Sequence, residues 1–151
     1  MDGPDIWLSI LGEVYDVTNG IEFYGPNAGG YSVFAGRDAS VPFVTGRFNE
    51  EEAKKGLDSI SINELSALEH WKDFYKDSDK YHYIGILVDP RYYDEEGKPT
   101  PAFLEYQERS ETSKEMKRQF HEDEKAKVEA RKAEAFASIK EQRAKAKAKK
   151  V

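Results

Sequence analysis

The chain contains no cysteine, which excludes disulfides, iron–sulfur clusters, zinc thiolate sites and a thiol nucleophile. Histidine is scarce, and its three positions are His70, His82 and His121. These show neither the spacing of a paired metal site nor that of a catalytic triad, so a structural or surface role is expected for each. The longest apolar stretch near the start, 6–11, is interrupted by Ser9 and is too short for a membrane span or a signal-peptide core. As written, the chain is expected to be soluble.

Glycine and proline are absent from Phe103 to Lys150, where Ala, Glu, Lys, Arg and Gln dominate. These residue types favour helix, so we expect a globular domain at 1–103 followed by a charged helical tail at 104–151. The apolar residues of the tail are sparse and hold no heptad, which argues against a strict coiled coil. A solvated helix is the main interpretation, and a helix that docks on a partner is the alternative.

Charge divides the chain in the same place. Before Phe103 there are 9 Lys+Arg against 19 Asp+Glu, and from Phe103 onward there are 14 against 10. An acidic globular part argues against nucleic acid as its partner, because that binding depends on phosphate neutralisation by Lys and Arg. A basic or metal-loaded partner suits it better.

The first part of the chain has the pattern of a small α+β fold. Six glycines and two prolines among aromatic residues over 19–47 indicate short helices and tight loops, a region that can build a pocket. The elements expected are strands at 6–11 and 14–17, short helices over 19–47, a helix at 50–57, a longer helix with Asn63 as N-cap, a strand at 81–88 and a loop over 90–101.

Most patterns that could carry chemistry have a structural explanation. The acidic clusters at 50–52 and 94–96 lack the alternating oxygen ligands of a calcium loop, and the glycines of 25–36 do not form a dinucleotide fingerprint. The remaining candidates are the tyrosines of the pocket-like segment 19–47 and of the strand predicted at 81–88. Buried tyrosines usually pack and hydrogen-bond their hydroxyls, so the residues alone do not assign a ligand role.

Three motifs resemble the membrane-associated progesterone receptor family, a branch of the cytochrome b5-like fold. They are VYDVTNG at 14–20, FYGP at 23–26 and YSVFAGRDAS at 31–40. Within that family, the neuferricin branch is the most similar, through FVTG at 43–46, WKDFY at 71–75 and the loop at 91–101. The resemblance spans about residues 6–104 and implies a cytochrome b5-like haem/steroid-binding domain with a small mixed sheet and short helices.

The resemblance also implies a cofactor and its ligand. Ordinary cytochrome b5 holds haem iron between two histidines, but the equivalent segment here, 24–31, has none. The family pattern implies five-coordinate ferric haem b with Tyr31 as axial phenolate, and Tyr24, Lys80 and Tyr81 beside it. A phenolate favours ferric iron, and its formation releases a proton, so haem affinity should fall as pH drops.

A local ion pair between Arg37 and Asp38 is expected to shape the loop that follows Tyr31.

The leading hypothesis is a non-enzymatic haem-binding protein that regulates partners, with an open haem face able to stack on another protein or on a second copy. The alternative is a haem-free adaptor of the same fold that binds protein or lipid. Electron transfer is a weaker third hypothesis, because bis-histidine ligation is missing. The resemblance implies the endomembrane system or secretion, with membrane contact only through an anchor outside these residues.

Overall fold

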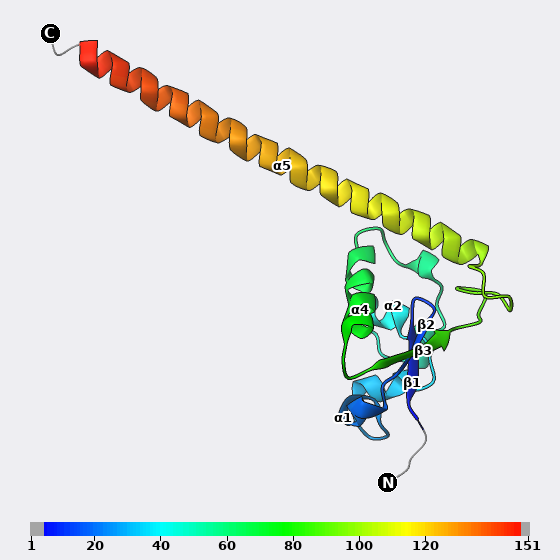
Figure 1. Ribbon diagram of the computed structural model, residues 1–151. Helices are drawn as coiled ribbons and strands as arrows, with labels where there is room; N and C mark the ends of the chain where they lie inside the picture. The colour runs from blue at the N-terminus through cyan, green and yellow to red at the C-terminus, as the bar shows by residue number, and fades with distance from the viewer. Residues whose placement is uncertain (1–4, 149–151) are drawn as a thin grey trace. The chain divides into compact units, whose positions relative to one another are not determined.

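The structure is a computed structural model that describes residues 5–148, and its first part contains a three-stranded antiparallel sheet (Figure 1). Strands β1 (Trp7–Ile10) and β2 (Glu13–Asp16) form a hairpin, and β3 (His82–Ile86) pairs with β2 on its other side. A single parallel bridge joins Ser9 to Asp38 at the β1 edge. The strands confirm the positions expected from the apolar alternation.

The hairpin turn depends on a glycine. Leu11 and Gly12 have φ of 49° and 78°, the left-handed region that glycine adopts without strain. A Cβ on Gly12 would lie 2.8 Å from the Cβ of Tyr92. The absence of a side chain therefore allows both the turn and the close approach of the later loop.

Short helices fill the segment between β2 and β3. They are η1 (Thr18–Gly20), α1 (Ile21–Tyr24), η2 (Gly30–Phe34), α2 (Ser40–Thr45), α3 (Glu50–Ala53), η3 (Leu57–Ser59) and α4 (Leu65–Asp77). The prediction of short helices over 19–47 is confirmed. The single helix predicted at 50–57 is wrong, because it stops after one turn and Gly56 separates it from η3.

The start of α4 also differs from the prediction, which had Asn63 as N-cap. The Glu64 carboxylate accepts hydrogen bonds from the Ser61 backbone N–H and hydroxyl, at 3.2 and 2.6 Å. This is half of a capping box, in which a glutamate reaches back to the residue three positions earlier. Ser61 therefore begins the turn that leads into α4.

The core lies between one face of the sheet and α2 and α4, which contact each other (Figure 1). Leu8 and Tyr15 come from the sheet, and Leu68 and Tyr75 come from the apolar face of α4. All four are 1% exposed or less. This arrangement of a small sheet with helices on one face confirms the α+β class.

The long helix α5 (Pro101–Ala148) begins three residues before the helical tail predicted at 104–151, and the end of that tail, 149–151, lies outside the described residues. The chain divides into two compact units, one through Ser113 and one from Lys114. Within the first unit, Phe103 and Tyr106 are buried. From 114 to 148 every residue is exposed. No helix within 5–148 has the length and apolar character needed to cross a membrane.

Candidate functional site

Tyr31 lies in η2, half-buried among aromatic rings. Gly29, just before it, has φ of 105° and would meet nothing with an added Cβ, so glycine is needed there for its backbone freedom alone. The ring centroids of Tyr24 and Phe48 lie 6.0 and 5.3 Å from that of Tyr31. Within residues 5–148, no hydrogen bond holds the Tyr31 hydroxyl. This oxygen is available to an external partner.

Tyr24, at the end of α1, is fixed in the core by a second tyrosine. Its hydroxyl lies 2.6 Å from that of Tyr75 in α4, and the ring of Tyr81 meets its edge at a centroid distance of 5.9 Å. Burial raises the pKa of Tyr24 to about 12. Near neutral pH Tyr24 is therefore a neutral phenol that can donate or accept a hydrogen bond.

Lys80 lies beside Tyr81 and is paired with an acidic residue. Its Nζ lies 2.8 Å from a carboxylate oxygen of Glu22, and 5.6 and 5.9 Å from the ring centroids of Phe23 and Tyr81. The hydrogen bond to Glu22 raises the pKa of Lys80 and lowers that of Glu22. The predicted site residues thus gather around Tyr24, while the ammonium already has a counter-ion that sequence reasoning missed.

Comparison with known proteins gives the family. The sequence profile of the Cytochrome b5-like Heme/Steroid binding domain matches residues 1–87. The chain belongs to this family. A hypothetical protein from Arabidopsis thaliana, described as having a cytochrome b5-like fold, has a solved structure that superposes with a TM-score of 0.51 at 34% identity, over 58% of this chain and 77% of that one. The predicted haem/steroid-binding fold is therefore confirmed.

The curated relatives agree with the resemblance to the progesterone receptor and neuferricin branches. A neuferricin homolog of Drosophila pseudoobscura pseudoobscura is 43% identical over 107 residues, 70% of this chain and 36% of that protein. Neuferricin of Mus musculus is 42% identical over 97 residues, 64% of this chain and 35% of that protein. Membrane-associated progesterone-binding protein 4 of Arabidopsis thaliana is 46% identical over 95 residues, 63% and 37%. The matches thus span little more than a third of these relatives.

In this haem/steroid-binding domain, stacked rings form a wall beside Tyr31. Phe43 and Trp71 lie parallel, with ring centroids 4.3 Å apart and an interplanar angle of 10°. Such surfaces suit a flat aromatic ligand. Trp71 and Tyr75 are four positions apart, so helical periodicity places them on the same side of α4. Glu22 and Phe48 belong to no periodic apolar pattern, so the sequence did not indicate them.

The donor set around Tyr31 fits an iron porphyrin. A phenol that loses its proton is a hard anionic ligand suited to ferric iron. His70 and His82 are exposed, and His121 lies in the second unit. Among residues 5–148 there is no group of three or more His, Cys, Asp or Glu side chains that could hold a metal ion. The Tyr31 oxygen, which has no hydrogen bond within the described residues, is the candidate metal donor of this cluster.

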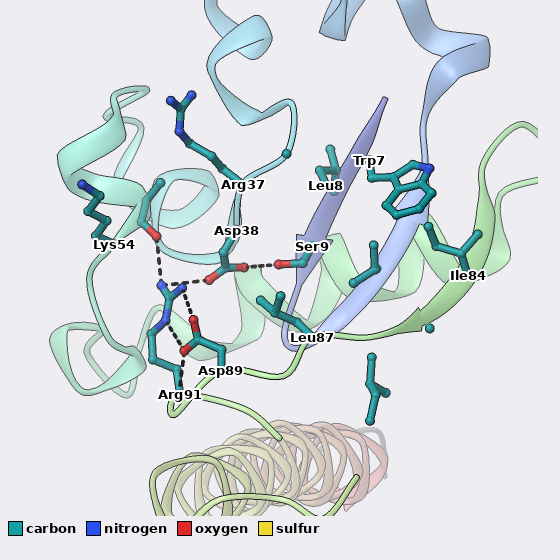
Figure 2. A pocket seen from close by; sticks show the side chains of 15 residues that line it. Trp7, Leu8, Ser9, Arg37, Asp38, Lys54, Ile84, Leu87, Asp89 and Arg91 are labelled. Carbon is teal, nitrogen blue, oxygen red and sulfur yellow. Dashed lines mark hydrogen bonds and ion pairs between the residues drawn. The ribbon is translucent and has the colours of Figure 1, made fainter. Parts of the chain in front are cut away.

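The Arg37–Asp38 ion pair predicted for this domain is wrong. Asp38 is buried and accepts hydrogen bonds from Ser9 Oγ at 2.9 Å and from the Tyr92 hydroxyl, with Arg91 NH1 3.4 Å away. Figure 2 shows Ser9, Asp38 and Arg91 turned toward one another and Arg37 turned away. Arg37 instead lies 3.5 Å from Glu50. The bridge of Asp38 to β1 directs its side chain inward, so its neighbour points to solvent.

A cavity of about 570 Å³ adjoins this buried network (Figure 2). Its lining combines Asp38 and Arg91 with apolar sheet residues such as Val14 and Ile84. Val14 alternates along β2 with the core residue Tyr15, so the cavity lies on the opposite face of the strand. The lining contains none of Tyr24, Tyr31, Lys80 and Tyr81.

Proposed function

We propose that this domain is a non-enzymatic haem-binding module in which the Tyr31 phenolate is the axial ligand of five-coordinate ferric haem. The observation that carries the proposal is the Tyr31 hydroxyl, which is free of hydrogen bonds within the described residues and lies in an aromatic wall without imidazole. Bound haem would supply a ferric centre with one open coordination position. We propose haem b as the cofactor; the chain has no cysteine for the thioether attachment of haem c.

The surrounding residues support this role through packing and charge. Tyr24 stacks on Tyr31 and is anchored by the Tyr75 hydroxyl, so it fixes the ligand ring as a neutral neighbour. Tyr81 packs against Tyr24 from the other segment. Lys80 supplies the positive charge that favours an anionic ligand nearby.

The open side of the site suits regulation of partners. Phe48 and Phe23, at the edges of the cluster, are 41% and 48% exposed. A haem face next to such residues offers an apolar surface on which a partner protein, or a second copy, can stack. We infer that haem occupancy controls this contact.

Haemin titration of the purified chain tests the proposal. The wild type should give the spectrum of high-spin ferric haem with tyrosinate ligation, and Tyr31→Phe should lose it. The control is Tyr83→Phe, because Tyr83 is 57% exposed and belongs to β3. An unchanged spectrum in Tyr31→Phe would refute the ligand assignment. A reversible six-coordinate, low-spin spectrum would favour electron transfer instead.

One observation favours a second candidate, a haem-free adaptor. The cavity of about 570 Å³ on the far face of the sheet is of the size that binds small molecules. Near it Trp7, Ile84 and Val88 are 49%, 44% and 56% exposed. If haemin produces no Soret shift in the wild type, this face becomes the leading site for protein or lipid.

A further inference from the structure

We infer that Glu22 sets the haem affinity of this domain by competing with the bound ligand for the ammonium of Lys80. The inference rests on the proposed haem site and assigns its control to one residue that the resemblance did not indicate. In this competition, the Lys80 ammonium leaves the Glu22 carboxylate and pairs with a carboxylate of the bound haem.

The ion pair of Glu22 and Lys80 joins two of the segments that carry the tyrosine cluster. Glu22 and Tyr24 lie on the single turn of α1, whereas Lys80 and Tyr81 lie just before β3, almost sixty positions later. The carboxylate and the ammonium meet at 2.8 Å. Asn19 Nδ2 donates a hydrogen bond to the Lys80 carbonyl at 3.2 Å, which ties the two segments together on the backbone side.

The direction of Lys80 is also set by rings of the site. Its Nζ lies 5.6 Å from the Phe23 centroid and 5.9 Å from the Tyr81 centroid, so it sits over both aromatic faces. Glu22 holds the ammonium there from the solvent side. The charge is thus placed next to the cluster but neutralised by its partner.

Ferric haem with a phenolate ligand carries two further negative charges, on its propionates. These carboxylates would attract Lys80 and repel Glu22. Both side chains are about half exposed, at 44% and 53%, and exposed ion pairs contribute little stability, so an incoming carboxylate can replace Glu22 at small cost. Glu22 therefore opposes binding twice, by its own charge and by occupying the lysine.

Haemin titrations of Glu22→Gln against wild type test the inference. The variant should bind haemin about 3- to 10-fold more tightly at low ionic strength, and the difference should shrink in high salt because exposed charges are screened. Lys80→Met should weaken binding. In the Lys80→Met background the competition is absent, so the gain from Glu22→Gln should shrink to the part that comes from direct repulsion between Glu22 and the propionates.

Glu95→Gln is the matched control, because it removes the same charge from an exposed position in the loop after β3. If Glu22→Gln and Glu95→Gln change affinity equally, or if the gain from Glu22→Gln is undiminished in the Lys80→Met background, the competition for Lys80 is refuted while the haem site stands. If the wild type binds no haemin, the proposed function itself fails. Thermal unfolding without haemin confirms that each variant folds.

Discussion

At the scale of single residues, Asp38 shows how this fold accommodates a buried charge. Its side chain is 1% exposed and its carboxylate has the Ser9, Ser40 and Tyr92 hydroxyls as donors, with Arg91 as counter-ion. Hydrogen bonding compensates the cost of desolvation only while every partner is present. The segment that follows Tyr31 is thus joined to β1 and to the loop before α5 through one carboxylate.

Replacing this carboxylate should destabilise the domain strongly. We expect Asp38→Asn to lower the free energy of unfolding by about 3–5 kcal/mol, because an amide removes the charge that faces Arg91 and replaces one of two buried acceptor oxygens by an NH2 donor, so some of the hydroxyl donors lose their acceptor. Arg37→Gln is the comparison, and its exposed pair with Glu50 should contribute less than about 1 kcal/mol. Urea unfolding measures both. Equal losses in the two variants would instead favour the local Arg37–Asp38 pair.

Asp89 gives a pH dependence with a defined sign. Hydrogen bonds from Arg91 lower the pKa of Asp89 below its ordinary 3.8. A lowered folded-state pKa stabilises the fold above the ordinary value and loses that contribution as pH falls through the lower one. Wild type should therefore exceed Asp89→Asn in stability at pH 6, and the gap should narrow below about pH 4. Denaturant unfolding across this range measures the gap, and a gap independent of pH would contradict the assignment.

The tyrosines of the candidate site could be predicted from the sequence, whereas the long-range ion pairs of the fold could not. Tyr24, Tyr31 and Tyr81 were predicted because the family resemblance implies them together, and the structure brings their rings together. The pair of Glu22 with Lys80 joins positions 58 apart in sequence, and the pair of Asp38 with Arg91 is similarly distant. Such contacts depend on how distant segments pack together, so no local sequence pattern predicts them.

At the scale of elements, boundaries depend on competing local interactions. The sequence predicted the strands and the existence of α4, because apolar periodicity indicates both. It placed the start of α4 at Asn63, whereas the Ser61–Glu64 hydrogen bonds begin the turn earlier. Ser61 and Asn63 are both suited to the start of a helix and lie two positions apart, so the course of the backbone determines which of them begins the turn.

The hairpin turn offers an element-scale prediction. Gly12→Ala should destabilise the domain by about 2–4 kcal/mol, because it combines left-handed backbone strain with overlap in the interior. The overlap is with Tyr92 Cβ and Tyr93 Cε2, each 2.8 Å from the added atom. Gly46→Ala is the control: its φ is 75°, but a Cβ there meets nothing within 4 Å. Thermal unfolding should show the larger loss for Gly12→Ala, and similar losses would mean that backbone strain alone matters.

At the scale of the whole molecule, composition predicted a division between an aromatic-rich part and a charged helix. The structure places the boundary between compact units after Ser113 rather than near Phe103. The first turns of α5 pack into the first unit, where the Tyr106 hydroxyl donates to Glu69 at 2.9 Å. The sequence did not predict this packing, because the residues around Phe103 and Tyr106 are mostly charged and polar and are typical of a solvated helix.

Two truncations test the boundary. Removal of 114–151 should leave the unfolding midpoint and the haemin affinity of the remaining chain nearly unchanged, because the described residues 114–148 are all exposed. Removal of 103–151 should unfold the domain or lower its stability by several kcal/mol, about 3–5 kcal/mol for each large aromatic side chain lost from the core. Phe103 and Tyr106 are 4% and 3% exposed, and the Phe103 ring meets the buried Tyr92 at 5.5 Å. A large loss on removing 114–151 alone would show that the second unit stabilises the first, and equal stability of both truncations would restore the boundary at Phe103.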